Sequence, residues 1–306
     1  MDIKYLEFIQ KYLSETPVMH PDPTPVKSSW SKEKDIRAVV IDIYGTILIS
    51  ESGDIEESDI SARNLEESLH AANIKLLING DSLQKMLFQM LQLFRGEIIR
   101  IHEMERSADK PFPEIDIISI WNKILGHHRD LNHIEIGNPF CIKCFTFLFE
   151  NLSNTIYPMP GLKEVISRIS ESGIPLGIIS NAQFYTPSIL NFFLNDKISE
   201  EEFMPPFDPD ITVYSYKYQR AKPDPFLFDI VSRKCFEKYS IKPEQILFLG
   251  NDMFRDIYPA HKAGFKTVLF AGDNRSLRLR EEKPELKHIT PDHIITELDQ
   301  LTKILL

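Results

Sequence analysis

The side chains of this sequence that could carry out chemistry together stand at the ends of predicted strands or in the loops beside them. Asp42 is a carboxylate able to act as a nucleophile, Ser180 offers a hydroxyl group, and Lys222 offers a positive charge. Asp252 and Asp256 add two further carboxylates after another apolar run. In open parallel sheets, ligands bind outside the carboxyl ends of the strands. We therefore expect these side chains to meet at one edge of a sheet.

Buried parallel strands are the elements that must position these groups. Residues 36–41 form a largely β-branched run that is apolar on both faces, which is typical of a central parallel strand covered by helices on both sides. Residues 47–50 and the turn signal Ser52-Gly53 predict a small hairpin after Asp42. Farther along, strand patterns alternate with helix patterns, which predicts an α/β fold with a doubly wound parallel sheet. These predicted strands are 175–180, 211–214, 246–250 and 266–270, and the predicted helices are 162–172, 187–194, 226–237 and 257–263.

Two segments do not follow this alternation. Residues 55–156 contain little glycine and repeat apolar side chains every three or four residues, which predicts an all-helical insert. Residues 3–13 have the spacing of an amphipathic helix, and the prolines that follow it break regular structure. We expect residues 1–34 to form a helix and an extended strap outside the main fold, with a disordered leader as the alternative. The α/β core then comes from residues 35–54 and 157–306.

Composition and charge exclude several classes of protein. The chain has 306 residues, of which 42% are hydrophobic, so it has enough apolar side chains to bury a core. Lys and Arg number 35 against 45 Asp and Glu, a net charge of −10, which argues against a nucleic-acid partner. No apolar run approaches the roughly 18 residues of a membrane-spanning helix, so no membrane partner is expected. The N-terminus lacks the apolar stretch of a secretory signal and the chain has 3 cysteines, so a cytoplasmic location is expected.

Four segments in this order resemble the motifs of the haloacid dehalogenase superfamily. They are Asp42-Ile43-Tyr44-Gly45-Thr46, Ser180-Asn181, Lys222-Pro223-Asp224 and the segment from Gly250 to Asp256. One such motif is weak evidence, but four in order at strand ends are highly specific. The resemblance covers about residues 35–50 and 157–275. It implies a Rossmann-like α/β core, with the helical insert in the place of the family's cap domain.

The resemblance also implies how the reaction proceeds. Asp42 would attack the substrate and form a covalent aspartyl intermediate, which divides one difficult displacement into two. Thr46 and Ser180, with Asn181 beside it, would donate hydrogen bonds to the transferred group. Lys222 would neutralise charge on Asp42 and on a small anionic substrate.

A metal site is implied as well. Asp42, Asp252 and Asp256 would hold Mg²⁺, a hard cation that is usually bound by one or two carboxylates, waters and substrate phosphate. The main-chain carbonyl group of Tyr44 would complete the set of protein ligands. Asp252, however, lies one residue later after Gly250 than is usual in the family. Helix N-terminal acids, which the helix dipole favours, are the alternative explanation for the two aspartates.

The residue at position 44 leaves the reaction open. Phosphatases of the family carry an aspartate there, which protonates the leaving group, whereas tyrosine is a poor base at neutral pH. The Asp-x-Tyr-Gly-Thr form resembles the branch that removes halide from 2-haloacids, where no leaving-group proton is needed. Two features argue against that branch. Position 228, six residues after Lys222, is Phe where the dehalogenases have Tyr. Asp252 and Asp256 would also repel each other without a cation.

We therefore expect Mg²⁺-dependent hydrolysis of a small phosphate ester. The alternatives are a metal-independent 2-haloacid dehalogenase and a catalytically weak homologue that binds a ligand. Neither the substrate nor the oligomeric state follows from the sequence.

Some residues of the insert are weaker candidates for function. His127-His128 is the insert's best candidate for a substitute acid, although surface histidine pairs are commoner. Arg95, Arg100 and Arg106 could bind a substrate anion, although they suit a solvated helix face as well. Cys141 and Cys144 form a CxxC pair, but a structural zinc site needs four ligands, so helix cysteines are the better interpretation.

Overall fold

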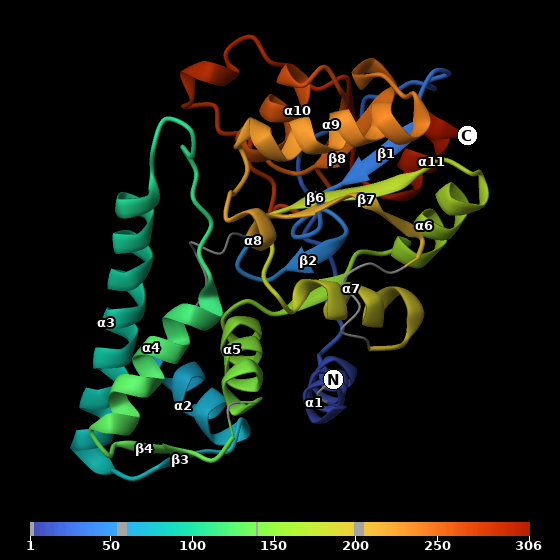
Figure 1. The fold of residues 1–306 in the computed structure, drawn as a ribbon. Helices are drawn as coiled ribbons and strands as arrows, with labels where there is room; N and C mark the ends of the chain where they lie inside the picture. The colour runs from blue at the N-terminus through green and yellow to red at the C-terminus, as the bar shows by residue number, and fades with distance from the viewer. Residues whose placement is uncertain (1–2, 54–59, 139, 199–204) are drawn as a thin grey trace.

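The structure is a computed structural model that describes residues 3–53, 60–138, 140–198 and 205–306 (Figure 1). Its centre is a six-stranded sheet with the order β10-β9-β8-β1-β6-β7. All neighbouring strands in this sheet run parallel. The strands are β1 (Ala38–Ile41), β6 (Leu176–Ser180), β7 (Phe207–Tyr214), β8 (Ile246–Gly250), β9 (Lys266–Phe270) and β10 (His293–Ile295). The predicted α/β class with a doubly wound parallel sheet is confirmed.

The side chains of β1 enter two apolar cores. Val39 and Ile41 belong to a core on one face of the sheet, and Ala38 and Val40 belong to a core on the other face. This is why a run that is apolar at every position forms the central strand. Helices α6 (Leu162–Glu171), α7 (Thr186–Asn195) and α11 (Asp299–Leu305) cover the first face, and α9 (Pro225–Tyr239) and α10 (Tyr258–Lys262) cover the second (Figure 1).

The insert packs around its own aromatic centre and stands to one side of the sheet (Figure 1). Trp121 is fully buried there, with its ring centroid 4.6 Å from that of Phe94 and 4.8 Å from that of Phe145. Its helices are α2 (Ala62–Ala71), α3 (Gly80–Glu105), α4 (Ile117–Asp130) and α5 (Phe140–Ser153). The prediction that the insert is all-helical is wrong in one respect. Strands β3 (Ile74–Leu76) and β4 (Ile134–Ile136) pair antiparallel at the end remote from the sheet (Figure 1).

The strand after Asp42 pairs with a distant partner. Strand β2 (Leu48–Ser50) pairs antiparallel with β5 (Ile156–Pro158), which follows the insert. The second strand of the predicted local hairpin would fall on residues 54–59, which lie outside the described residues. The chain does turn at Gly53, whose N–H donates to the carbonyl oxygen of Ser50 at 3.0 Å. Gly53 has a φ of +72°, and a Cβ atom there would lie 1.7 Å from the carbonyl oxygen of Arg275, so only glycine fits.

The N-terminal segment lies along the core and the insert. Helix α1 (Ile3–Glu15) buries Tyr5, Ile9 and Leu13 and packs against both α5 and α7 (Figure 1). The chain then continues as an extended strap that pairs with the edge strand β10 through Ser29 and Ile294.

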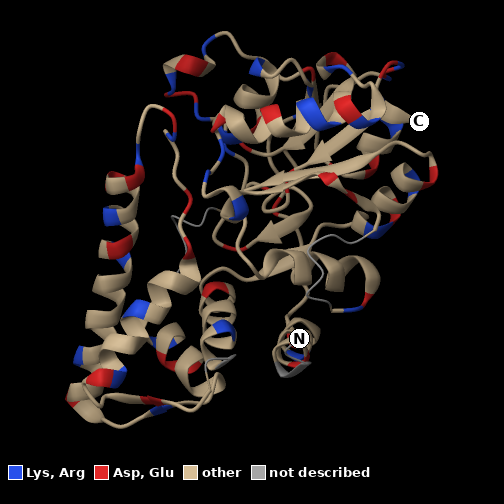
Figure 2. Ribbon diagram, in the orientation of Figure 1, with Lys and Arg blue, Asp and Glu red and all other residues tan. Residues whose placement is uncertain are grey.

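Charged residues and helix lengths complete the description of the surface. Lys and Arg are interspersed with Asp and Glu on the helices of both the core and the insert (Figure 2). Among the helices of the described ranges, none is long and apolar enough to cross a membrane.

Candidate active site

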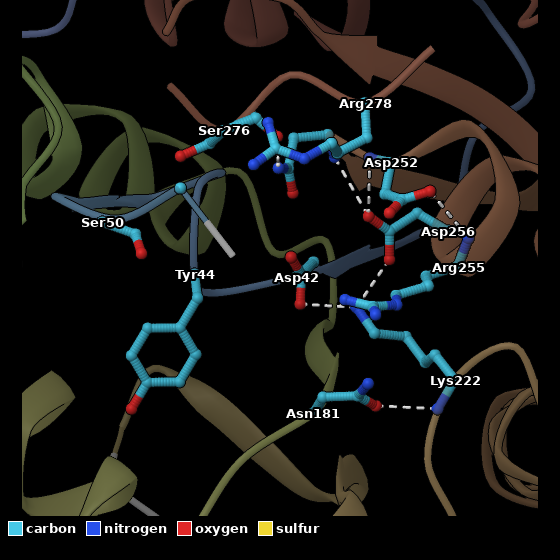
Figure 3. Close-up of a pocket in the computed structure, with 12 residues that line it drawn as sticks. Asp42, Tyr44, Ser50, Asn181, Lys222, Asp252, Arg255, Asp256, Ser276 and Arg278 are labelled. Atoms are coloured by element: carbon cyan, nitrogen blue, oxygen red, sulfur yellow. Dashed lines mark hydrogen bonds and ion pairs between the residues drawn. The ribbon is translucent and has the colours of Figure 1, made fainter. Parts of the chain in front are cut away.

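A pocket opens at the carboxyl edge of the sheet (Figure 3). It lies between the loops that follow β1, β6, β8 and β9, the end of β2 and the loop that carries Lys222. Because β1 lies in the middle of the sheet, Asp42 stands near the centre of this edge. The residues that line the pocket are Asp42, Tyr44, Ser50, Gly53, Asn181, Lys222, Asn251, Asp252, Arg255, Asp256, Ser276 and Arg278. The structure therefore brings Asp42, Asn181, Lys222, Asp252 and Asp256 together, as the strand-end positions predict.

Lys222 joins two buried carboxylates in this pocket. Its Nζ atom lies 2.6 Å from Oδ1 of Asp42 and 2.5 Å from Oδ1 of Asp256 (Figure 3). Burial alone would lower the pKa of Lys222, but the charges of Asp256 and Asp42 outweigh burial and raise it, so the ammonium group stays charged. Burial, with help from the nearby charges of Asp42 and Asp252, raises the pKa of Asp256 to about 7 although Lys222 opposes the shift. The single positive charge of Lys222 thus stabilises two carboxyl groups, those of Asp42 and Asp256.

The loop after β6 holds the Lys222 loop in place. Oδ1 of Asn181 accepts a hydrogen bond from the main-chain N–H of Lys222 at 2.7 Å. The carboxylate of Asp224 caps α9 by accepting from the N–H of Phe226 at 3.0 Å, and it also pairs with Arg220 at 3.1 Å. Lys222 therefore projects from a loop that is fixed on both sides, which keeps its long side chain aimed at Asp42.

The two predicted hydroxyl donors are fully buried and do not line the pocket. Oγ1 of Thr46 lies 3.2 Å from Oδ2 of Asp42 and 3.1 Å from Oδ1 of Asn251, so this hydroxyl group holds the Asp42 carboxylate in position. The hydroxyl group of Ser180 donates to the main-chain oxygen of Asn181 at 3.3 Å. In this structure Ser180 supports the loop and its hydroxyl group does not face the pocket.

The segment after β8 explains the unusual spacing of its two acids. Oδ2 of Asp256 accepts from the main-chain N–H groups of Asn251 and Asp252 at 3.1 and 3.0 Å. A Cβ atom at Gly250 would lie 2.5 Å from the carboxyl carbon of Asp256, so glycine is needed for this approach. A π-helical turn, Met253–Ile257, carries Asp256 back toward Lys222.

Asp252 lines the pocket, but its carboxylate is engaged elsewhere. Its Oδ1 atom caps the π-helical turn by accepting from the N–H groups of Phe254 and Arg255 at 2.8 and 3.0 Å. Its Oδ2 atom forms an ion pair with Arg280 at 2.8 Å. Asp252 thus matches the alternative of a helix N-terminal acid better than the predicted metal pair with Asp256.

The oxygen atoms around Asp42 fit Mg²⁺ only in part. Within the described ranges, no three His, Cys, Asp or Glu side chains are grouped as a metal site. Oδ1 of Asn251, a residue that the sequence analysis missed, lies 3.1 Å from the Thr46 hydroxyl group that also bonds Asp42. The position of Asn251 directly after Gly250, the last residue of β8, is the feature of the sequence that could have identified it. Asp42, the Tyr44 main-chain carbonyl group and Oδ1 of Asn251 are the donors that suit this cation.

Two arginines that the sequence analysis also missed line the pocket. Arg255 comes from the π-helical turn and Arg278 from the loop after β9 (Figure 3). Together with Lys222 they set three cationic groups against the three carboxylates of Asp42, Asp252 and Asp256. No sequence pattern pointed to Arg278, because it lies in an irregular loop, where the spacing of residues does not predict which way a side chain points.

The side chain of Tyr44 points away from the carboxylate of Asp42 (Figure 3). Its hydroxyl group forms a 2.8 Å hydrogen bond with Oγ1 of Thr186. Burial raises the pKa of Tyr44 further above its already high ordinary value. The phenol at this position is therefore turned away from Asp42 and stays protonated at neutral pH.

The histidines and arginines that the sequence analysis singled out in the insert are not among the residues that line the pocket. His128 is buried near the end of α4 that adjoins the paired strands β3 and β4, where its Nδ1 atom lies 3.1 Å from Nδ1 of His133. Burial lowers the pKa of His128 to about 4. Arg100 pairs with Glu97 on the exposed face of α3 at 2.8 Å. Within the described ranges, Cys141 and Cys144 are not joined in a disulfide.

Comparison with known proteins gives a family and named relatives. Residues 36–264 match the family model described as haloacid dehalogenase-like hydrolase. The chain is 26% identical over 212 residues to glyceraldehyde 3-phosphate phosphatase of Pyrococcus furiosus, covering 67% of this chain and 80% of the relative. It is 23% identical over 240 residues to phosphoglycolate phosphatase of Escherichia coli O157:H7, covering 78% of this chain and 82% of the relative.

A solved structure shares the fold. The 2-haloacid dehalogenase from Pseudomonas syringae pv. Tomato DC3000 superimposes with a TM-score of 0.52 at 14% identity, covering 88% of this chain and 97% of that chain.

Proposed function

Since the chain belongs to the haloacid dehalogenase-like hydrolases, we propose that it hydrolyses a small phosphate ester through a covalent phosphoryl group on Asp42. The observation that carries this proposal is the buried pairing of Asp42 with Lys222 at 2.6 Å in a pocket that two arginines also line. A phosphate monoester brings up to two negative charges on three oxygen atoms. Three cationic groups suit it better than they suit the single carboxylate of a 2-haloacid. The relatives that are named phosphatases support the same choice.

The chain's own residues account for the first displacement. The carboxylate of Asp42 attacks phosphorus, and the bond from phosphorus to the leaving oxygen breaks on the opposite side. Lys222 holds one oxygen of Asp42, so the other is the one that attacks, and Thr46 fixes its direction. Water then attacks the phosphoryl group and releases phosphate and free Asp42. If Mg²⁺ binds, it supplies positive charge at the phosphoryl oxygens, held by Asp42, the main-chain carbonyl group of Tyr44 and Oδ1 of Asn251.

We also propose that the insert acts as a cap over this pocket. Its segment between α3 and α4 joins the core directly beside Lys222. The N–H of Ala221 donates to the carbonyl oxygen of Phe112 at 2.8 Å, and the N–H of Glu114 donates to that of Gln219 at 3.0 Å. A cap that touches the loop of a catalytic lysine can exclude water and select the organic part of the substrate.

A metal-independent dehalogenase is the second candidate. Tyr44 favours it, because this side chain offers no proton to a leaving group, and halide needs none. The two reactions differ in their products, since one releases phosphate and the other releases halide.

The test measures both products with one set of proteins. We expect phosphate release from phosphate esters, reduced by EDTA and restored by Mg²⁺, and no halide release from 2-chloropropionate. Asp42→Asn should abolish turnover, because an amide is a far poorer nucleophile than a carboxylate. Asp81→Asn, an exposed aspartate on α3, is the matched control and should retain full activity.

Two results would contradict the proposal. Halide release without added metal would establish the dehalogenase. Failure to turn over either class of substrate, combined with binding of a phosphate ester, would establish a ligand-binding homologue.

A further inference from the structure

Ser276 and Arg278 reach the pocket from the loop that follows β9 (Figure 3). We call this loop, residues 271–280, the arginine loop. Every residue of the arginine loop is described, and none of them belongs to a helix or a strand. A side chain that binds a substrate must be held within about 0.5 Å of its productive position. The contacts that hold this irregular loop therefore decide whether Arg278 can act on a substrate.

One set of contacts joins the arginine loop to the segment after β8. The carbonyl oxygen of Ser276 accepts from Nδ2 of Asn251 at 2.6 Å, and the N–H of Arg278 donates to the carbonyl oxygen of Asn251 at 3.1 Å. Oδ1 of the same amide accepts from the hydroxyl group of Thr46, which also bonds Asp42. Consecutive hydrogen bonds thus link the arginine loop to Asp42.

The guanidinium group of Arg278 is oriented by main-chain atoms. Its Nη1 atom donates to the carbonyl oxygens of Arg275 at 2.7 Å and Leu277 at 3.2 Å. The turn at Gly53 packs against the same group, because a Cβ atom there would lie 3.0 Å from Nη2 of Arg278. Both carbonyl acceptors belong to the arginine loop itself. The direction of the guanidinium group therefore follows the conformation of this loop.

A second set of contacts joins the arginine loop to residues 20–24 of the N-terminal strap. Oγ1 of Thr24 donates to the carbonyl oxygen of Ala271 at 2.6 Å, where the loop leaves β9. The N–H of Asn274 donates to the carbonyl oxygen of Asp22 at 2.7 Å. The strap thus bonds the arginine loop at two points that come before Arg278 in the chain.

Asp273 connects the strap to the turn that leads to Arg278. Its side chain is buried, and its Oδ1 atom accepts from the N–H of Asp22 at 3.1 Å. The same oxygen accepts from the main-chain N–H and from Nε of Arg275 at 3.2 and 3.0 Å. A buried carboxylate is costly unless it is hydrogen-bonded. One oxygen that bonds both segments therefore fixes the strap and the loop relative to each other.

We propose that Arg278 binds a phosphoryl oxygen of the substrate and that the N-terminal strap, through Thr24 and Asp273, holds Arg278 in the position to do so. The inference rests on the proposed phosphatase function. Thr24 and Asp273 are positioning residues, since they contact the loop and its neighbours rather than the substrate. An arginine pairs with phosphate through parallel N–H bonds, which require a defined direction of the guanidinium plane. A loop that shifts away from the strap therefore weakens the binding of phosphate.

The test measures binding of inorganic phosphate by isothermal titration calorimetry, with Mg²⁺ present in all samples. We expect Arg278→Ala to weaken binding by roughly 10–100-fold, Asp273→Ala by roughly 3–30-fold and Thr24→Val by roughly 2–10-fold. Thr16→Val is the matched control, because it makes the same chemical change in the same N-terminal segment. The hydroxyl group of Thr16 donates to the carbonyl oxygen of Tyr12 at 3.1 Å, beside the end of α1. This control should bind phosphate as tightly as the wild type.

A double-variant comparison distinguishes positioning from a general loss of structure. If Asp273 acts through Arg278, then Asp273→Ala should change the phosphate affinity by less than about 2-fold once Arg278→Ala is already present. Thr24→Val should behave in the same way in that background. Thr24→Val also keeps the comparison decisive if thermal melting shows that Asp273→Ala unfolds.

The outcomes separate this inference from the proposed function. Unchanged affinity in Arg278→Ala, or equal losses from the strap variants with and without Arg278, would overturn the inference while phosphate release by the wild type upholds the phosphatase. A wild-type protein that neither binds phosphate nor releases it from an ester would contradict the proposed function and this inference with it.

Discussion

At the scale of single residues, the pocket is built so that few carboxylate oxygens remain unengaged. Lys222 neutralises Asp42 and Asp256 together, main-chain N–H groups hold the other oxygen of Asp256, and Arg280 holds Asp252. Removing one partner of such a buried group leaves an uncompensated charge, which costs several kcal/mol. Glu150 on α5 differs from these acids, because within the described ranges its carboxyl group has no hydrogen-bond or ion-pair partner. This difference has a consequence for stability.

The stability of the protein should depend on the protonation of Glu150. Its pKa is raised from an ordinary value of 4.5 to about 7, so the folded protein binds this proton more tightly than the unfolded chain does. The stability that the folded protein gains from this tighter proton binding is therefore fully present below about pH 4.5 and is lost as the pH rises to about 7. Each unit of pKa shift corresponds to about 1.4 kcal/mol before solvent screening reduces it.

Glu150→Gln should remove the loss of stability that the wild-type protein shows as the pH rises. We expect the variant to gain thermal stability relative to the wild type at pH 8 but not at pH 5, as measured by melting temperatures across that range. Glu285→Gln, an exposed glutamate, is the control and should shift neither value. A constant difference between Glu150→Gln and the wild type at all pH values would contradict the raised pKa.

At the scale of elements, the parallel strands were the most predictable part of the molecule. A run that is apolar on both faces, such as residues 38–41, has few alternatives to a central strand, so Asp42 and its place at the sheet edge followed directly. Lys222 and Asp256 followed from the same reasoning. The engagement of Asp252 did not, because the π-helical turn at Met253–Ile257 has no periodic sequence pattern. Strands β3, β4 and β10 are three residues long, which is too short to show alternation.

Gly250 should be essential to the turn that delivers Asp256. In Gly250→Ala, the new methyl group would lie 2.5 Å from the carboxyl carbon of Asp256, so the pair with Lys222 must shift. We expect a loss of unfolding free energy of roughly 1–3 kcal/mol in urea titrations and a loss of most hydrolytic activity. Gly126→Ala on α4 is the matched control, because nothing lies within 4 Å of the added group. That variant should be neutral or slightly more stable. Normal activity in Gly250→Ala would show that Asp256 is dispensable.

At the scale of the whole molecule, α1 connects parts that are distant in sequence. It packs against α5 of the insert and against α7 of the core, and Tyr5 stacks on Phe184 in the loop after β6 at 6.2 Å. Long-range packing of this kind is not encoded locally. The sequence predicted that this helix has an apolar stripe, but no pattern in residues 3–13 identifies the helices that cover it.

Ile9→Ala should loosen this connection. Ile9 is fully buried, and truncating such a side chain costs about 2–5 kcal/mol. We expect faster amide deuterium exchange in α1 and in the part of α5 around Phe147, while the strands of the sheet remain protected. Gln10→Ala on the exposed side of the same helix should leave exchange unchanged. Uniformly faster exchange throughout the sheet would show that α1 is part of one cooperative unit with the core.

The pairing of β2 with β5 determines how the insert can change without disturbing Asp42. Ser50 and Ile156 are register partners, and the N–H of Glu51 donates to the carbonyl oxygen of Thr155 at 2.9 Å, so the chain leaves the core and returns to it at adjacent points. A segment attached through two neighbouring stems can be exchanged for another of different length while the strand order of the sheet stays the same. In the proposed phosphatase, the residues that break the phosphate ester bond are therefore separable from the insert that would admit the substrate.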